Sequence, residues 1–535
     1  MVDIIGLSKI RAVINDSLYG SIPVNEIEYN IIQTPVFNRL HNIRQLGPTY
    51  LIYPGAKHSR FEHSLGVMHL ASKMLENILS TLAYDEFVKL FNNRTREFIF
   101  LLFREGVFSE LRYLNIHDVL KAFLVQSIRL AGLLHDLGHY PYSHVVEEGI
   151  GKRGLHEKIT HELILSWKEL REILLPLTYE LNGSKVTGIT PEHVVAILMN
   201  SFHRRRLLSE SKSYIPLLDS QGYNLLHKVI SGVFDADRLD YLRRDALHTG
   251  VVYGIVDIDR IIDSMHVVRD KDSFLIYYDL KALPALEDML SSRIKMYKLV
   301  YYHHKNVLLA EITRRMIYEA IRLSDQKKDH RYKRMLVDDI VNTLISYPWK
   351  VTDNLLIDIA EYLLNNATRH SKAYYYAEAF LNRQLLPMTI FKREEDLYHF
   401  IATILNGNIK LSKYRLLINN LVKDINKLED YIHKESNGEI ELLTASIKYH
   451  GVSPKDILIK VGDTLVNMSK LSHYIKWLDK YYTGYKHVYM YIYTLDQEKM
   501  IKYKRDPVER KKIVNKVLKL IRNFILNSLF DKLSM

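Results

Sequence analysis

The doublet His135-Asp136, in the run LAGLLHDLGHYPYSH, is the part of this chain whose residue types most directly indicate chemistry. Two distant segments supply residues of the same kind, because His63 lies in RFEHSLG and Asp237 lies in VFDADRLDYLRRD. Two imidazoles and two carboxylates form a mixed nitrogen and oxygen ligand set, which suits Mn, Fe, Zn or Mg. A divalent metal of this kind binds phosphate oxygens and lowers the pKa of its water. The four residues therefore predict a metal site for the hydrolysis of phosphate esters.

The adjacent positions of His135 and Asp136 place a condition on the backbone. Neighbouring residues on a regular helix diverge by about 100°, so both side chains can reach one ion only near a helix end. Gly138 and Pro141 follow shortly afterwards and favour such an end. We therefore expect the metal at the C-terminal end of a helix.

Further histidines follow the doublet, and one of them is expected to donate a proton. Loss of an alkoxide from phosphorus requires a donor, and His139, His144 and His156 are the candidates. Glu147 lies three residues after His144, where a carboxylate on the same helical face sets the tautomer of an imidazole. A purely structural role is the alternative for each histidine taken singly.

The elements that position these residues are predicted to be mainly helical. Gly and Pro are scarce, at 22 and 13 residues, and apolar residues recur at spacings of three and four. The run at 292–321 is predicted to be helical throughout, whereas the segments 50–55 and 272–280 have the composition of short strands. The charged run at 324–334 is the best candidate for a domain boundary. We thus expect a catalytic domain over residues 1–323 and a helical C-terminal region over residues 324–535.

Composition limits the classes of protein that need to be considered. A chain of 535 residues is long enough for two or three domains. The absence of cysteine excludes disulfides, thiolate metal sites and cysteine nucleophiles, and it fits an intracellular, cytoplasmic protein. We expect neither a secretory signal nor a membrane span, since no run approaches roughly 18–20 apolar residues. The net charge of +12 favours polyanionic partners, although solubility alone explains it equally well.

The C-terminal tail carries much of this charge. Residues 499–519 hold nine Lys and Arg residues against Asp506 and Glu509. After Pro507, apolar residues recur every four positions, which predicts a helix with one apolar and one basic face. Weak contact with single-stranded nucleic acid is one interpretation of the basic face. We favour the other, a solvated face of a packed helix.

The motifs together resemble a known family. The segments VINDSLYGSI, IIQTPVFNRLHNIRQLGPTYLIYPGAKHSRFEHSLGV, LAGLLHDLGHYPYSH and FDADRLDYLRRD are similar in order and spacing to the HD-domain deoxynucleoside triphosphate triphosphohydrolases. The similarity covers roughly residues 8–310 and is greatest to the branch that pairs an HD domain with a SAM domain, which we do not expect here. It implies an HD-type helical bundle and cleavage of a dNTP to a deoxynucleoside and inorganic triphosphate. It also implies a homotetramer.

Roles for individual residues follow from the resemblance. It makes His63, His135, Asp136 and Asp237 the metal ligands, and it assigns water activation and leaving-group protonation to His139, His144, Glu147 and His156, with His161 as a competitor for the last position. Arg60, Arg238 and Arg293 would bind phosphates, although the family usually has lysine at position 238. The implied contacts on the sugar side are Gln45 and Leu46, which crowd out a 2′-hydroxyl, together with Tyr241, Asp245 and Tyr301.

The resemblance also implies an allosteric nucleotide site. The residues concerned are Val13, Asn15, Gln33, Arg260, Arg269 and Lys271. Family members that read guanine have an acidic residue where this chain has Gln33, and His41 replaces a nearby arginine. An amide is less selective for a guanine edge than a carboxylate, so we expect an effector site with altered base choice.

Two other functions fit the same residues. One is an HD phosphohydrolase acting on a different nucleotide or on an oligonucleotide phosphoester. The other is a nucleic-acid-binding regulatory protein that keeps the fold and uses the basic tail. The intact ligand set argues against the second, because a binding protein has no need of it.

Overall fold

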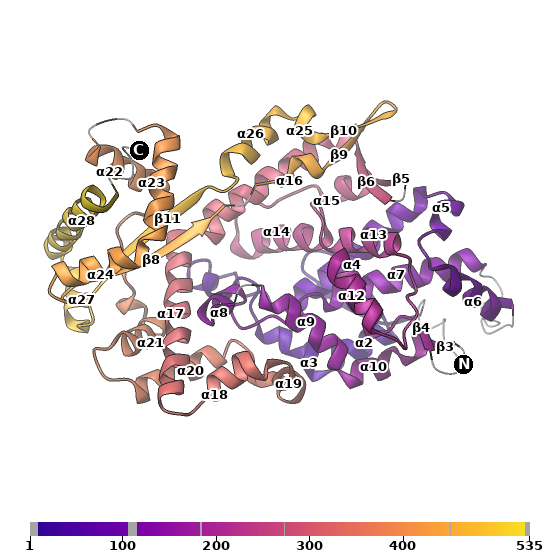
Figure 1. The fold of residues 1–535 in the computed structure, drawn as a ribbon, viewed down its shortest axis with the longest axis horizontal. Helices are drawn as coiled ribbons and strands as arrows, with labels where there is room; N and C mark the ends of the chain where they lie inside the picture. Colours follow the sequence, from indigo (N-terminus) through magenta and orange to yellow (C-terminus); the bar gives the residue numbers. More distant parts are fainter. Residues whose placement is uncertain are drawn as a thin grey trace.

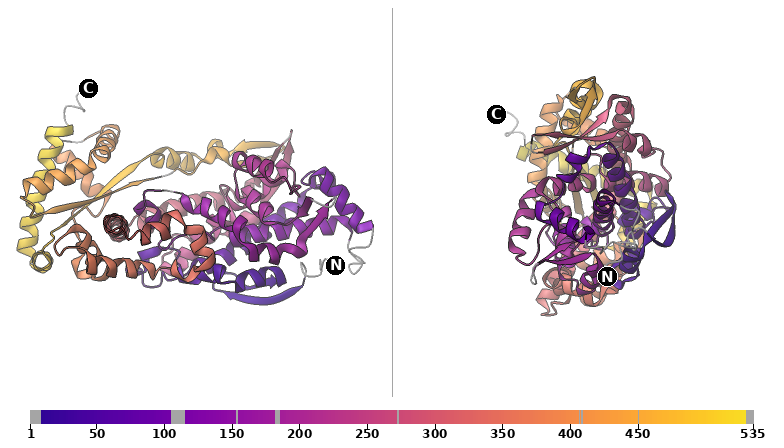
Figure 2. Two further views of the ribbon diagram at one scale, coloured as in Figure 1. Left: turned by 60° about the horizontal axis from the view of Figure 1, so that its bottom comes forward. Right: turned by 90° about the vertical axis from the view of Figure 1, so that its right-hand side faces the viewer.

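The computed structural model describes residues 9–104, 115–152, 154–181, 185–271, 273–405, 407, 409–449 and 451–529. The molecule is elongated (Figures 1 and 2), with α5 and α6 at one end of its long axis and α27 and α28 at the other. The predicted regions 1–323 and 324–535, and the segment 8–310 that resembles the family, include residues outside the described part, which are 1–8, 105–114, 153, 182–184, 272, 406, 408, 450 and 530–535.

Most elements of the first half of the chain are helices, interrupted by three short strand pairs. They are β1 (Ile10–Asp16), β2 (Gly20–Asn25), α2 (Glu26–Gln33), α3 (Pro35–Asn38), α4 (Arg60–Thr81), α5 (Tyr84–Val88), α6 (Asn93–Arg104), α7 (Ile116–Leu134), α8 (His144–Gly149), α9 (Leu155–Ser166), α10 (Lys168–Leu174), β3 (Thr178–Leu181), β4 (Lys185–Gly188), α11 (Pro191–Leu198), α12 (Ser201–Glu210), α13 (Ser220–Ile230), α14 (Ala236–Thr249), α15 (Ile258–Asp263), β5 (Met265–Asp270), β6 (Ser273–Asp279) and α16 (Leu283–Met296).

The second half continues with helices and two further groups of strands. They are α17 (His304–Gln326), α18 (Arg331–Lys333), α19 (Ile340–Ser346), α20 (Leu355–Asn366), α21 (Lys372–Leu381), β7 (Met388–Thr389), α22 (Glu394–Ile404), α23 (Leu411–Lys423), α24 (Ile425–Glu435), β8 (Glu441–Lys448), β9 (Leu458–Val461), β10 (Thr464–Asn467), α25 (Met468–Leu471), α26 (His473–Tyr482), β11 (Lys486–Tyr493), α27 (Gln497–Arg505) and α28 (Pro507–Leu529).

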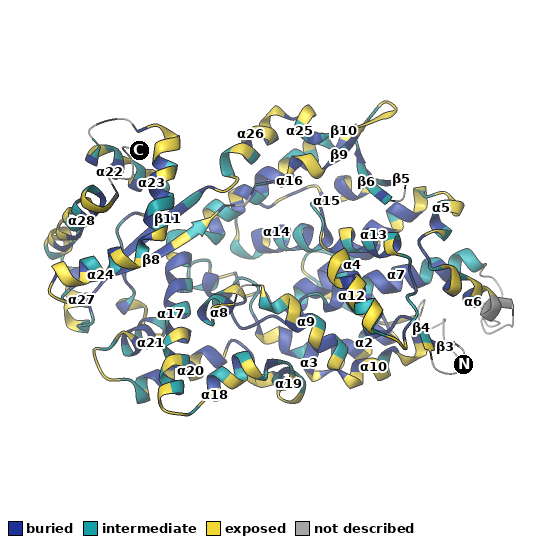
Figure 3. Ribbon diagram, in the orientation of Figure 1, coloured by how far each residue is buried: buried dark blue, intermediate teal, exposed yellow. Residues whose placement is uncertain are grey.

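Helices α4 and α7 form the buried centre of the first half of the chain. We call this half the catalytic half because it holds the four predicted metal ligands. Both are among the most buried helices of the chain (Figure 3), and they pack directly against each other. Gly132 permits this approach, since a Cβ atom there would lie 3.0 Å from the Cα of Met68. Because His63 lies in α4 and His135 follows α7, the contact between the two helices brings their ends together.

The mainly helical fold class is confirmed, but the C-terminal region also contains strands that the sequence analysis did not predict. Strands β7, β11 and β8 form an antiparallel sheet in that order. Strand β11 is central and nearly all buried, so its run KHVYMYIY lacks the alternation that marks a half-exposed strand. Strand β9 pairs in parallel with β6, so the C-terminal region extends a sheet that begins in the catalytic half.

Two local predictions need correction. The run at 292–321 is not one helix, because a π-helical turn at Tyr297–Tyr301 precedes a break at which His303 has ψ 133° and accepts a hydrogen bond from the N–H of Lys305. The segment 50–55, predicted as a strand, instead continues from a 3-10 helix at Gly47–Leu51. Pro48 starts this helix, and the N–H groups of Ile52 and Tyr53 both donate to the carbonyl of Thr49. The strand predicted at 272–280 is confirmed over Ser273–Asp279 as β6, whereas Leu280 begins a 3-10 helix and residue 272 lies outside the described part.

The predicted boundary at 323/324 falls within α17, which contacts α8 on one side and α20 and α21 on the other. The charged run 324–334 does coincide with the end of this helix. The division of the chain into 1–323 and 324–535 stays a prediction.

Within the described part of the chain, no helix has the length and apolar character needed to cross a bilayer.

The two faces of α28 are expected to contribute differently to the free energy of unfolding. Ile513, Val517, Ile521 and Ile525 are buried, whereas Lys511 and Lys512 are exposed. Replacing Ile521 by alanine should lower the free energy of unfolding by about 2–5 kcal/mol, because it leaves a cavity. Lys511→Ala should change it by less than about 0.5 kcal/mol. Chemical denaturation of both variants tests this, and equal losses would contradict the packed-helix interpretation.

Candidate metal centre and active site

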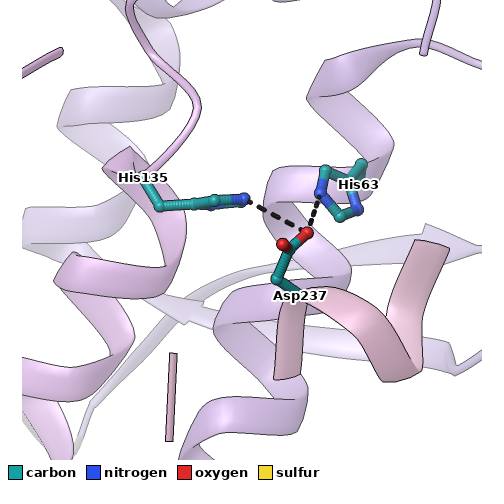
Figure 4. A group of neighbouring side chains, drawn as sticks. All are labelled: His63, His135 and Asp237. Atoms are coloured by element: carbon teal, nitrogen blue, oxygen red, sulfur yellow. Dashed lines mark ion pairs between the residues drawn. The ribbon is translucent and has the colours of Figure 1, made fainter. Parts of the chain in front are cut away.

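Three of the four predicted metal ligands converge at the ends of three helices. His63 lies in the first turn of α4, His135 caps the C-terminal end of α7, and Asp237 lies in the first turn of α14. The carboxylate of Asp237 faces both imidazoles (Figure 4), with its Oδ1 3.1 Å from Nε2 of His63 and 3.8 Å from Nε2 of His135. One ligand atom from each residue lies within 4.8 Å of the others. The helix end expected near residue 135 is thus confirmed.

The two imidazoles are oriented as metal ligands are. Nδ1 of His135 lies 2.8 Å from the carbonyl oxygen of Gly132, which can only accept, so Nδ1 carries the proton. Nδ1 of His63 lies 2.7 Å from Oδ2 of Asp240. Both Nε2 atoms are buried and make no well-directed hydrogen bond to a described residue, although carboxylate oxygens of Asp136 and Asp237 lie 3.1 to 3.8 Å away. Buried polar atoms are almost always paired, so this donor set fits a divalent cation.

Asp136, the fourth predicted ligand, lies beside this group and is also held by Arg60. One carboxylate oxygen is 3.3 Å from Nε2 of His135, and the other is 3.6 Å from Nε2 of His63. The second oxygen accepts a hydrogen bond from Nη1 of Arg60, while Nε of Arg60 donates to Ser143 at 3.0 Å. Burial would raise the pKa of Asp136, but His135 and Arg60 hold it well below its usual range. The carboxylate is therefore charged beside the other three predicted ligands.

The predicted acid–base residues form a second cluster around Glu147, which is fully buried at the start of α8. Its Oε1 accepts from the backbone N–H of His156 at 2.8 Å and lies 2.6 Å from Nδ1 of the same residue. The expected partner His144 is farther away, at 3.4 Å from Oε2. The ring of His139 stacks on that of His156 with centroids 4.0 Å apart. Glu147 thus orients His156 more closely than His144, and the competing residue His161 makes no such contact in the described structure.

The charge of Glu147 follows from these contacts. Burial would raise the pKa of Glu147, but hydrogen bonds from His144 and His156 outweigh this effect and hold that pKa well below its usual range. The carboxyl is therefore ionised. Burial, together with the nearby charges of Arg60 and His156, holds the pKa of His139 far below that of a free histidine. The cluster therefore combines the Glu147 carboxylate with one imidazole of lowered pKa, His139, and two that contact the carboxylate, His144 and His156.

The residues implied on the sugar side also meet. Asp245 is buried in α14, with Oδ1 2.8 Å from Nε2 of His58 and Oδ2 accepting from the hydroxyl of Tyr301 at 2.6 Å. The rings of Tyr241 and Tyr301 lie edge to face with centroids 6.5 Å apart. His58 was not predicted, although it stands two residues before Arg60.

The other implied substrate residues, Arg293, Arg238, Gln45 and Leu46, each have their own surroundings. The guanidinium of Arg293 lies over the ring of Tyr297 at 5.7 Å. That of Arg238 turns back to the carbonyl of Gly232 and to Asp235, whose Oδ2 is 3.6 Å away. Gln45 is partly buried and its Oε1 has no partner among the described residues, while Leu46 precedes the 3-10 helix at Gly47–Leu51.

The residues of the implied effector site lie on the surface, in separate segments. Val13 and Asn15 are exposed on β1, Gln33 ends α2 and Arg260 lies in α15. Arg269 on β5 lies 3.4 Å from Glu86, and Lys271 follows that strand. His41 is stacked on Phe61 at 3.6 Å between centroids.

A buried cation that the sequence analysis missed shapes the turn after the doublet. Arg39 is 3% exposed, and its Nη1 donates to the carbonyls of His139 at 2.9 Å and Val351 at 3.1 Å, while Nη2 donates to Leu137 at 2.5 Å. Asp353 adds a second link, since its carboxylate accepts from Nη1 of Arg44 at 3.1 Å. No local motif marks Arg39, because its partners are backbone carbonyls far away in the chain.

Comparison with known families identifies the class of protein. Residues 60–242 match the family model of the HD domain, and residues 256–354 match that of the HD-associated region. The two matches cover just over half of the chain and contain all four predicted ligands. The chain therefore belongs to the HD-domain proteins, which are metal-dependent phosphohydrolases.

Individual relatives narrow the similarity further. The deoxynucleoside triphosphate triphosphohydrolase SAMHD1 homolog of Dictyostelium discoideum is 27% identical over 339 residues, which are 63% of this chain and 55% of that protein. An uncharacterized protein of Methanocaldococcus jannaschii is 30% identical over 347 residues, or 65% of this chain and 56% of that protein. The resemblance to the family of dNTP triphosphohydrolases is thus confirmed, although the chain spans only about half the length of these relatives.

A solved structure shares the fold over nearly the whole chain. The crystal structure of a hypothetical protein from Aquifex aeolicus aligns with a TM-score of 0.58 at 24% identity, covering 92% of this chain and 99% of that one. The likeness shows that the fold is shared across both halves of the chain.

Proposed function

We propose that this protein hydrolyses dNTPs to a deoxynucleoside and inorganic triphosphate, with a divalent metal held by His63, His135, Asp136 and Asp237. The observation that carries the proposal is the meeting of two buried Nε2 atoms with the carboxylate of Asp237, beside the His156–Glu147 pair. When bound, the metal supplies Lewis-acid chemistry at a phosphate and acidifies water. The donor set allows Mn, Fe, Mg or Zn.

The residues around the metal centre have complementary tasks in this proposal. Arg60 places a buried guanidinium beside the metal ligands, where it binds the triphosphate chain. Glu147 holds Nδ1 of His156, so that Nε2 of that ring can deliver a proton to the departing 5′-oxygen. His139 packs against His156 and keeps its ring in place. A water molecule forms the new bond to the α-phosphorus, and the bond that breaks is the one between that phosphorus and the 5′-oxygen of the sugar.

The sugar is recognised on the opposite side of the site. Asp245 accepts hydrogen bonds and is held between His58 and Tyr301, which leaves it oriented for the 3′-hydroxyl. Gln45 and Leu46 would crowd out a 2′-hydroxyl, as the resemblance implies. Arg238 and Arg293 supply further positive charge for the phosphates.

Regulation and assembly extend the proposal. Val13, Asn15, Gln33, Arg260, Arg269 and Lys271 would bind a nucleotide effector between subunits of a homotetramer, which agrees with their exposure in the single chain. Light scattering with and without each nucleotide tests the assembly. Nucleic-acid binding by the tail gains no support, because Lys516 contacts Glu439 at 3.3 Å and the apolar face of α28 is packed.

The test of the reaction is release of triphosphate from each dNTP and NTP, with Mn²⁺ or Mg²⁺ and with or without a second nucleotide. We expect triphosphate from dNTPs and none from NTPs, and stimulation by the second nucleotide if the effector site works. No release in any combination, with metal bound, would favour another phosphoester as substrate.

The role of Asp245 gives a sharper prediction. Asp245→Ala removes a hydrogen-bond acceptor for the sugar, so kcat/KM should fall by about 10–100-fold, mainly through KM. A dideoxynucleotide, which lacks the 3′-hydroxyl, should then be hydrolysed equally by the variant and the parent. A similar loss on both substrates would show that Asp245 acts on the fold rather than on the sugar.

A further inference from the structure

The turn between β1 and β2 is fixed by a residue that also points into the catalytic half. Oδ1 of Asp16 accepts from the backbone N–H groups of Leu18 at 2.8 Å and Tyr19 at 3.1 Å. Its Oδ2 lies 2.8 Å from Nη1 of Arg244 in α14, and its side chain is 2% exposed. One carboxylate therefore joins the hairpin turn to the helix that carries Asp237.

Arg244 also pairs with a second carboxylate, that of Asp240. Its Nε and Nη2 both donate to Asp240 at 2.9 Å, a bidentate pair in which both side chains are fully buried. Bidentate pairs fix orientation as well as distance. Gly66 leaves the room for it, because a Cβ atom there would lie 1.9 Å from Oδ1 of Asp240.

Asp240 in turn contacts a predicted metal ligand, which completes a buried series of side chains: Asp16, Arg244, Asp240 and His63. Its Oδ2 lies 2.7 Å from Nδ1 of His63, the nitrogen opposite the one that faces Asp237. The same carboxylate therefore contacts Arg244 through both of its oxygens and His63 through one of them. A carboxylate on the far nitrogen of a histidine ligand fixes its tautomer and ring angle.

We propose that the β1–β2 hairpin positions the metal centre through Asp16, Arg244, Asp240 and His63, so that the hairpin turn controls the affinity for divalent metal. This inference rests on the metal-dependent function proposed above. Four side chains that are each at most 2% exposed connect a surface hairpin to one ligand nitrogen. Burying two acids and an arginine costs free energy that apolar residues would not, which argues for a positioning role.

The matched control lies in the same hairpin. Arg11 and Glu26 form an ion pair at 3.0 Å with both side chains more than half exposed. Arg11→Gln removes this pair without touching the buried series. Asp16→Asn keeps an oxygen for the turn but loses the charge that holds Arg244, and Arg244→Lys keeps the charge but loses the bidentate geometry.

The experiment measures Mn²⁺ affinity by electron paramagnetic resonance without substrate. Asp240→Asn should weaken binding about 10–100-fold, and Asp16→Asn and Arg244→Lys about threefold or more, whereas Arg11→Gln should leave it unchanged. In a double-mutant cycle, Asp16→Asn should have little further effect once Asp240 is asparagine. The rise in melting temperature on adding Mn²⁺ reports the same affinity in a variant of lower stability.

The outcomes separate this inference from the proposed function. Equal Mn²⁺ affinity in the parent and in the Asp16, Arg244 and Arg11 variants would overturn the inference, whichever substrates are hydrolysed. Additive effects of Asp16→Asn and Asp240→Asn would do the same. Weakened binding in a protein that releases no triphosphate would support the inference while contradicting the proposed reaction.

Discussion

Asp237→Asn is expected to reduce turnover roughly a thousandfold or more and to weaken metal binding. A catalytic metal supplies several kcal/mol of transition-state stabilisation, and about 1.4 kcal/mol is a factor of ten in rate. One oxygen of Asp237 faces both imidazoles of the group (Figure 4), so the substitution removes one of the negative charges that balance the cation. His135→Ala should have the same effect.

The measurement is kcat with saturating Mn²⁺, together with metal content by mass spectrometry after gel filtration. Asp263→Asn, an exposed carboxylate at the end of α15, is the matched control and should bind metal and turn over as the parent does. Near-normal turnover in the Asp237 variant would contradict the assignment of this metal site.

Glu147→Gln is expected to lower kcat by about 10²–10⁴, the usual contribution of a positioned acid or base. The amide cannot hold both Nδ1 of His156 and the backbone N–H groups of His156 and Gly154, which the carboxylate now accepts. Metal affinity of the group around His63 should stay unchanged, since Glu147 belongs to the second cluster rather than to that group.

A comparison on the neighbouring helix makes this result specific. Glu157, exposed in α9, can be changed to glutamine without touching the cluster, so Glu157→Gln should retain full kcat. If Glu147→Gln lost metal as well as rate, the two clusters would act as one site and the division of tasks would be wrong.

The sequence was sufficient for those parts of the site that lie close together along the chain. The end of α7 at Leu134 followed from Gly138 and Pro141, and that end is what brings His135 to the ion. Asp240 and Arg244 were missed although they follow Asp237 in the same helix. Their spacing of four residues looks like an ordinary helical ion pair, and only the fold shows that it leads to His63.

Other elements depended on distant contacts. The break at His303 has no glycine or proline to announce it, and the fully buried strand β11 lacks the alternation of a half-exposed strand. Arg39 binds carbonyl oxygens from two regions more than two hundred residues apart, which no local pattern can reveal.

The links formed by Val351, Asp353 and β9 have a practical consequence for anyone who shortens this chain. A fragment cut after residue 323 would leave Arg39 buried with fewer acceptors and Arg44 without its carboxylate. It would also open the edge of β6 that β9 covers, and open edges pair with other molecules and aggregate. A recombinant fragment for crystallography or domain shuffling should therefore extend past β9, even though every predicted ligand lies far upstream.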